Sequence, residues 1–183
     1  SIAGARAFSA CKHVGLNVAA DPLFTGSYTG VNGGLVFAVA DDPGMHSSQN
    51  EQDSRFYAVA AKLPMLEPAD SAECLAYTKK AFELSEEYDT PVLLRLSTRI
   101  SHSRTLAEKS ERRNQALKEY VKDPAKYVMM PANARGRRVV VEERSNKLAA
   151  LAETSAFNTL EMHDTTIGVI SSGIAYQYAR EAL

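Results

Sequence analysis

The sequence has 183 residues, of which 45% are hydrophobic and 23% charged, and this composition excludes a disordered chain. At this length the chain can form one domain with a full hydrophobic core. Its 21 Lys and Arg residues nearly balance 22 Asp and Glu residues. No net positive charge therefore attracts nucleic acid or an anionic membrane, and we expect neither as a partner.

The two cysteines, Cys11 and Cys74, are too few for a disulfide framework or a zinc knuckle, which favours a reducing compartment. No apolar run approaches the roughly 18 residues that a transmembrane helix needs. The first residues also lack the basic and then apolar pattern of a signal peptide. We therefore expect a cytoplasmic protein.

The first third of the chain contains many small residues and glycines. Residues 2–13 carry alanines at helical spacing and are followed by Gly15, so the pattern predicts a helix that ends there. Residues 15–34 contain four glycines after Gly15, together with the turn-forming pair Asp21–Pro22, and this composition predicts a long loop. Long loops in compact domains are often functional.

Two apolar runs predict strands buried on both faces. Residues 35–40 form a continuous apolar run after Gly34, and residues 91–96 form a second one that opens with proline. Between them we expect a short helix at 55–61 and an extended segment at 64–68. A longer helix should follow, opened by an Asp70–Glu73 capping pair and ending near Tyr88. Strand, helix, strand implies a right-handed parallel unit.

The second half of the chain is more polar. Residues 105–146 are dense in Lys, Arg and Glu, which indicates solvated helices broken near Asp123 and Pro131 rather than a binding patch. A further helix is expected over 136–156. Residues 166–171 then predict a strand and residues 175–183 a helix.

These elements predict an α/β fold with a mostly parallel sheet and flanking helices. We assign residues 1–104 to part of one α/β domain and residues 105–160 to a charged helical linker. A single strand and helix cannot form a core alone, so residues 161–183 are expected to begin a second α/β domain.

Ligands of open α/β sheets bind beyond the carboxyl ends of the strands, which directs attention to two polar segments. Residues 41–55 offer donors, acceptors and both charges in one loop, although a solvated loop with capping side chains explains them equally well. Residues 99–104 place Arg99 and Arg104 around His102, a set suited to a carboxylate or phosphate. Surface salt bridges are the alternative there.

Other chemistries lack their motifs. The sequence has no Gly-x-Ser-x-Gly elbow, no phosphate-binding loop and no Gly-x-Gly-x-x-Gly at a strand end. No cluster of metal-ligating residues stands out, and we expect no metal site in the chain. The histidines have no positioned partner that spacing alone reveals.

Several stretches together resemble one family, the alpha subunit of indolepyruvate ferredoxin oxidoreductases. The resemblance covers nearly the whole chain, with its most specific part at residues 41–53, which read DDPGMHSSQNEQD. The other matching stretches are residues 13–23, 28–31, 33–36, 82–86, 91–95 and 98–104, followed by the last predicted strand and helix.

The resemblance implies a thiamine-diphosphate-dependent enzyme that decarboxylates aryl 2-oxoacids such as indolepyruvate, joins the acyl group to coenzyme A and reduces ferredoxin through iron–sulfur clusters. Residues 1–104 would then be a truncated pyrimidine-binding domain. The implied cofactors of the full enzyme are thiamine diphosphate, Mg²⁺ and 4Fe-4S clusters, none of them expected on this chain alone. The implied partners are a beta subunit and ferredoxin.

The resemblance also implies roles for individual side chains. Those expected to contact the cofactor are His46, Gln49, Asn50, Gln52 and Asp53. Those expected to bind the substrate are Arg99, Ser101 and His102, with Arg55 and Arg104 as further candidates. No catalytic residue is expected within the chain, because the glutamate that activates the cofactor should precede Ser1. We therefore expect a fragment that is inactive in isolation.

An alternative hypothesis, in which the chain is not part of an enzyme, stays open. The chain could be a non-catalytic α/β module that docks on a partner subunit through its sheet edge and apolar faces. In either case uncovered apolar surface predicts self-association of the isolated chain.

Overall fold

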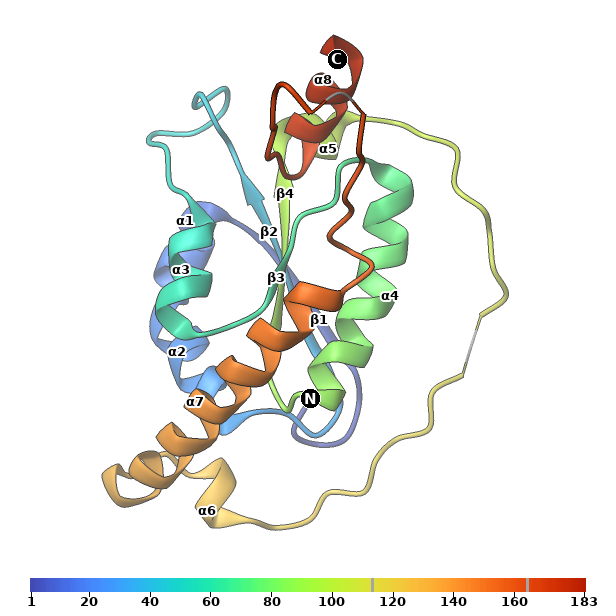
Figure 1. Cartoon of the computed structure of the whole chain (residues 1–183). Helices are drawn as coiled ribbons and strands as arrows, with labels where there is room; N and C mark the ends of the chain where they lie inside the picture. The colour runs from blue at the N-terminus through green and yellow to red at the C-terminus, as the bar shows by residue number, and fades with distance from the viewer. Residues whose placement is uncertain (113, 164) are drawn as a thin grey trace.

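The computed structural model describes residues 1–112, 114–163 and 165–183. Its described residues form a four-stranded, all-parallel sheet in the order β1-β2-β4-β3 with helices on both faces (Figure 1). This confirms the predicted α/β class. The strands are β1 (Ala7–Lys12), β2 (Leu35–Asp41), β3 (Met65–Leu66) and β4 (Val92–Ser97).

The two predicted apolar strands form the centre of the sheet. β2 and β4 pair in parallel from Val36 opposite Val92 to Asp41 opposite Ser97. Apolar side chains point to both faces of a buried parallel strand, which explains the continuous apolar runs. β2 follows Gly34, where an added Cβ would lie 2.9 Å from the Phe82 carbonyl oxygen. Glycine therefore permits the close approach of a covering helix.

One face of the sheet is covered by α1 (His13–Val18), α2 (Ala20–Thr29) and α3 (Ser54–Ala61). The prediction of a short helix at 55–61 is confirmed. Burying each large apolar side chain of this layer contributes about 1.5–3 kcal/mol. The buried cluster consists of Leu16, Leu23, Val39, Ala58, Ala61, Leu63 and Leu93.

The other face is covered by α4 (Ser71–Glu87), as predicted. The Asp70 side chain caps it by accepting a hydrogen bond from the Glu73 backbone N–H at 2.8 Å, and Glu73 Oε2 accepts from the Ala69 N–H at 2.7 Å. These bonds satisfy donors that the first turn of a helix leaves free. The buried cluster on this face consists of Val36, Leu66, Ala81, Leu84, Val92 and Leu94.

The predictions for residues 2–34 are wrong. Residues 7–12 form the edge strand β1 instead of a helix, and the predicted long loop contains α1 and α2. The spacing of small residues is a local signal, whereas pairing of β1 with β2 along its whole length decides the conformation. Gly15 reflects close packing, since an added Cβ would lie 3.0 Å from the Cys11 Cβ.

The predictions for the second half are partly confirmed. The breaks near Asp123 and Pro131 precede α6 (Pro124–Tyr127) and α7 (Pro131–Thr154), but the described residues between 103 and 123 form no helix. α8 (Ile174–Ala182) confirms the last helix. The strand predicted at 166–171 is wrong, because no described strand lies beside it to pair with it. The parts of these predictions that fall on residues 113 and 164 lie outside the described residues.

The long helix α7 is held mainly by polar contacts. Asp89, which follows α4, accepts hydrogen bonds from Lys126 at 2.8 Å and from Arg137 at 2.9 Å through its two carboxylate oxygens. Arg144 donates to the Asp89 carbonyl oxygen at 2.9 Å and to the Ser27 carbonyl oxygen at 2.8 Å. We call this set the Asp89 clasp. It ties α7 to both helical layers at the amino end of the sheet (Figure 1).

Within the part of the chain that the structure describes, no helix has the length and apolar character needed to cross a lipid bilayer.

Replacing Asp89 with Asn should loosen α7. The amide presents an N–H₂ group to one of the two cations, so we expect the free energy of unfolding to fall by about 1–3 kcal/mol in urea titrations. Glu143→Gln is the control, because Glu143 is exposed on α7 and makes no ion pair among the described residues. Equal stability of the two variants would contradict the clasp.

Candidate functional site

All four strands end at the same edge of the sheet, because they are parallel. The segments that follow β1, β2 and β4 therefore meet there, and α5 (Thr98–His102) continues directly from β4. This edge carries the polar segments that the sequence singles out. It is also where ligands bind in open α/β folds.

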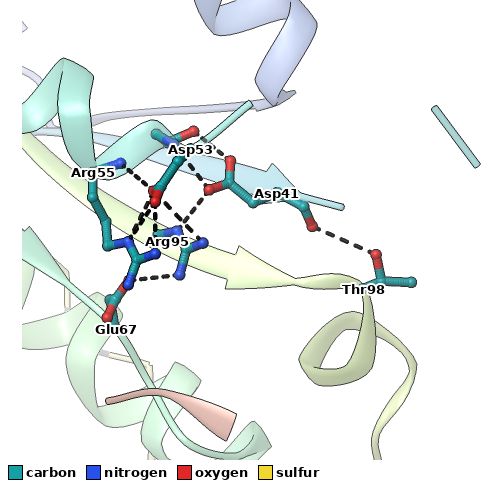
Figure 2. A network of polar contacts seen from close by, with 7 residues as sticks. Asp41, Asp53, Arg55, Glu67, Arg95 and Thr98 are labelled. Carbon is teal, nitrogen blue, oxygen red and sulfur yellow. Dashed lines mark hydrogen bonds and ion pairs between the residues drawn. The ribbon is translucent and has the colours of Figure 1, made fainter. Parts of the chain in front are cut away.

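A buried carboxylate is the centre of this edge. Asp41 is only 1% exposed, and its carboxylate accepts hydrogen bonds from Arg95 Nε at 2.6 Å, from the Ser54 N–H at 3.0 Å and from the Ser54 hydroxyl. Arg95 also donates to Glu67 at 2.7 Å. Figure 2 shows how Arg95, from the neighbouring strand, lies between these carboxylates. We call this set, with Asp53 and Arg55, the Asp41 network.

Asp53 ends the loop between β2 and α3. Its side chain caps α3 by accepting from the Arg55 N–H at 3.0 Å and also pairs with the Arg55 guanidinium at 2.6 Å. Arg95 approaches it at 3.8 Å. Hydrogen bonds from the Arg55 side chain hold the pKa of the Asp53 carboxyl below its usual range. The Asp53 carboxylate therefore holds the end of the loop in place.

Asp42 fixes the other end of the same loop. It is 2% exposed and accepts from the Ser48 hydroxyl at 2.6 Å, from the Thr98 hydroxyl at 2.6 Å and from the Ser47 N–H at 2.8 Å. Lys12 lies 3.7 Å away. The hydrogen bonds from Ser48 and Thr98 are the main causes that hold the Asp42 pKa well below its usual range. The loop is therefore anchored to β1 and to α5.

Beside this loop lies an open hollow of about 510 Å³ at the ends of β1 and β2. An ammonium group, two hydroxyl groups, an amide and one apolar side chain line it. Such a lining can donate and accept hydrogen bonds from a polar ring or an anion. The lining residues are Lys12, Val14, Ser47, Ser48 and Gln49.

The predicted cofactor residues divide between the hollow and the surface. Gln49 lines the hollow, whereas His46 and Asn50 are exposed. Gln52 donates to the Asn50 side-chain oxygen at 2.9 Å, and its own Oε1 is buried without a partner in the described structure. Asp53 belongs to the Asp41 network. The loop thus gathers these residues at one edge without pointing them all into one cavity.

The predicted substrate residues lie on α5. Thr98 joins α5 to the loop through Asp42. The Ser101 hydroxyl donates to the Ser97 carbonyl oxygen at 3.0 Å, and His102 is exposed. The Arg99 guanidinium lies over the Tyr178 ring, 5.6 Å from its centre. The two predicted segments are therefore neighbours, and the Arg99 guanidinium donates no hydrogen bond to the described residues.

Sequence reasoning missed several residues of this edge. Arg95 stands in an apolar strand, and a charge in a buried run is itself a signal that a carboxylate lies nearby. Lys12 and Thr98 gave no such signal. His13 is fully buried at the start of α1, and neither of its ring nitrogens has a partner in the described structure.

Comparison with known proteins gives relatives of one kind. Indolepyruvate oxidoreductase subunit IorA of Methanothermobacter marburgensis is 48% identical over 183 residues, which is 98% of this chain and 30% of that protein. The subunit of the same name from Archaeoglobus fulgidus is 43% identical over 185 residues, which is 100% of this chain and 30% of that protein. The one from Pyrococcus horikoshii is 44% identical over 190 residues.

Along its whole length the chain is similar to proteins named indolepyruvate oxidoreductase subunit IorA. The match extends along the whole chain, which spans about 30% of the length of these relatives. The family that the sequence resembles is thereby confirmed. No protein-family model and no solved structure matches the chain.

Arg95→Leu tests the Asp41 network. It leaves the Asp41 carboxylate buried without its cation, so the free energy of unfolding should fall by about 3–5 kcal/mol in denaturant titrations. Arg55→Leu is a matched control. It removes a guanidinium that is 54% exposed and pairs with Asp53, and it should cost less than about 1 kcal/mol. Similar losses in the two variants would contradict the central place of Asp41.

Asp42 should make stability depend on acid pH. Its pKa is lower in the folded than in the unfolded chain, so its contribution is complete above about pH 5, declines as the pH falls below that, and disappears only when the pH falls through the lowered pKa of the folded chain. Asp42→Asn should lower the Tm at pH 7 and give a curve that converges on the wild-type curve in acid. Asp21→Asn, an exposed control, should follow the wild-type curve. A constant gap between Asp42→Asn and wild type across this range would contradict the assignment.

Proposed function

We propose that this chain is part of a thiamine-diphosphate-dependent oxidoreductase. The full enzyme would oxidatively decarboxylate aryl 2-oxoacids such as indolepyruvate and transfer the acyl group to coenzyme A, with ferredoxin as electron acceptor. The single observation that carries the proposal is similarity over the whole chain to proteins named indolepyruvate oxidoreductase subunit IorA. The polar edge of the parallel sheet supports it.

The residues of the hollow fit one part of the cofactor. An aminopyrimidine ring carries both hydrogen-bond donors and acceptors, and hydroxyl and amide groups of Ser47, Ser48 and Gln49 can serve both. No carboxylate of the described residues lines the hollow, so we assign the activating glutamate to another part of the full-length subunit. When bound, the cofactor supplies the electron sink for decarboxylation.

In this proposal the chain itself binds and orients. The loop anchored by Asp42 and Asp53 would hold the cofactor from one side, with His46, Gln49, Asn50 and Gln52 as its exposed or half-buried polar groups. Arg99 would bind the substrate carboxylate, because its guanidinium is exposed and has no other hydrogen-bond partner among the described residues.

Ser101 and His102 would lie near the substrate on the same short helix. Their roles would be to orient it, because the Ser101 hydroxyl already donates to the backbone and can still accept a hydrogen bond. Neither side chain is assigned a proton transfer.

Metal cofactors are assigned to other parts of the enzyme. Among the described residues no group of three or more His, Cys, Asp or Glu side chains is placed to hold a metal ion. Mg²⁺ and the 4Fe-4S clusters would therefore bind elsewhere in the full-length subunit. The beta subunit and ferredoxin would dock on the assembled enzyme, and this chain alone would be inactive.

A second candidate, a docking module without a ligand, is favoured by exposed apolar side chains. Phe8 on the edge strand is 52% exposed, and Phe56 and Val59 on α3 are 74% and 77% exposed. Such side chains are typical of interaction surfaces when they lie together. In the proposed enzyme they would contact other domains or subunits.

The two candidates separate in one assay. The full-length protein, assembled with its partner subunit, should reduce ferredoxin when given indolepyruvate and coenzyme A, and removal of thiamine diphosphate should abolish the reaction. Gln49→Ala should raise the concentration of thiamine diphosphate needed for half-maximal activity about tenfold, the loss of one or two hydrogen bonds. If the chain were a docking module without a ligand, Gln49→Ala would leave the required concentration of thiamine diphosphate unchanged.

A further inference from the structure

Arg99 and Tyr178 meet at the carboxyl end of the sheet although they are far apart in sequence. Arg99 lies on α5, directly after β4, and Tyr178 lies on α8. The start of α8 rests near the segment that follows β3, where an added Cβ on Gly173 would lie 3.7 Å from the Pro68 carbonyl oxygen. Figure 1 shows α5 and α8 together at this end of the molecule. The pair therefore lies at the same carboxyl edge of the sheet as the polar loop, on the side of β4 and β3, whereas the hollow lies at the ends of β1 and β2.

The contact with Tyr178 leaves the N–H groups of the Arg99 guanidinium available for hydrogen bonds. The Arg99 guanidinium carbon lies 5.6 Å from the centre of the Tyr178 ring, and Arg99 donates no hydrogen bond to any described residue. A planar guanidinium held against a ring keeps its N–H groups directed outward in one plane. Carboxylates bind that edge through two parallel hydrogen bonds.

The ring is open as well. Tyr178 is 54% exposed, so a second aromatic group can pack against it. Aromatic pairs prefer offset or edge-to-face arrangements with centres about 4.5–7 Å apart. An aryl 2-oxoacid carries a carboxylate and an aromatic ring separated by a short linker. The pair thus offers one partner for each end of such a molecule.

A surface cation–π contact is a common feature of proteins, and its position distinguishes this one. The residue before Arg99, Thr98, donates to Asp42, which anchors the polar loop. A carboxylate held by Arg99 would therefore lie at the carboxyl edge of the sheet, one residue along α5 from the side chain that contacts the loop. The neighbouring Tyr176 differs, because its hydroxyl donates to Glu161 at 2.5 Å.

We propose that Arg99 and Tyr178 form the aryl-carboxylate subsite of the enzyme, in which Arg99 binds the carboxylate and Tyr178 determines the preference for aryl over aliphatic 2-oxoacids. This inference rests on the proposed function. Tyr178 acts by contact with the aryl group and takes no part in proton transfer.

The test compares indolepyruvate with pyruvate in the full-length protein. Tyr178→Leu should lower kcat/KM for indolepyruvate about threefold to tenfold, chiefly through KM, and leave pyruvate unchanged, because only the aryl contact is lost. Arg99→Lys should lower kcat/KM for both about tenfold, because lysine cannot form the paired hydrogen bonds. Tyr176→Leu and Arg180→Lys, on the same helix, are the matched controls and should change neither.

Binding without turnover gives a second readout. Indole-3-propionate lacks the 2-oxo group, and calorimetry should show weaker binding to Tyr178→Leu and to Arg99→Lys than to wild type. Unaltered affinity and unaltered selectivity in Tyr178→Leu would overturn the subsite while the proposed function stands. Failure of the full-length protein to oxidise any 2-oxoacid would overturn the proposed function. In that case, equal affinities of wild type and Tyr178→Leu for indole-3-propionate would overturn the subsite as well.

Discussion

The ion pair between Asp41 and Arg95 is the interaction on which the candidate site depends. A carboxylate that is 1% exposed at the end of the central strand needs a charged partner, because an unpaired charge in such a place is very costly. Arg95 supplies it from β4 and extends to Glu67 after β3, while Ser54 brings the start of α3 to the same carboxylate. One buried charge thus fixes three strands' ends and one helix relative to each other. This arrangement therefore fixes the position of the polar loop between β2 and α3.

The two ends of the sheet differ in the kind of contacts that their polar side chains make. At the amino end, the Asp89 clasp ties α7 across both helical layers, and only Val141 and Arg144 of that helix are buried among its described residues. At the carboxyl end, the loop anchored by Asp42 and the short helix α5 leave a polar hollow and a free guanidinium. A polar clasp at one end and open polar groups at the other agree with the proposed role of the chain in positioning a ligand.

Sequence reasoning succeeded where the signal was local and strong. The apolar runs of β2 and β4 and the Asp70 cap of α4 need no tertiary context to be recognised. It failed for β1, because alanines at helical spacing also suit an edge strand that has a partner. It failed for 166–171, because an apolar run becomes a strand only beside another strand.

The site was predictable to the same extent. The rule that ligands bind at the carboxyl ends of parallel strands was enough to select the loop after β2 and the segment of α5. The structure places these two segments side by side, because Thr98 donates a hydrogen bond to Asp42. Which side chains are free and which are structural did not follow, since Asp53 caps α3 and Arg55 pairs with it. The contact of Arg99 with Tyr178 joins segments that no local pattern connects.

Hydrogen–deuterium exchange on the full-length protein tests the central claim most directly. Addition of thiamine diphosphate and indole-3-propionate should slow exchange in residues 42–53 and 98–104, at the carboxyl end of the sheet, and leave α7 unchanged. Protection confined to α7, or none within these 183 residues while the ligands bind elsewhere in the protein, would contradict the assignment of the site to this edge.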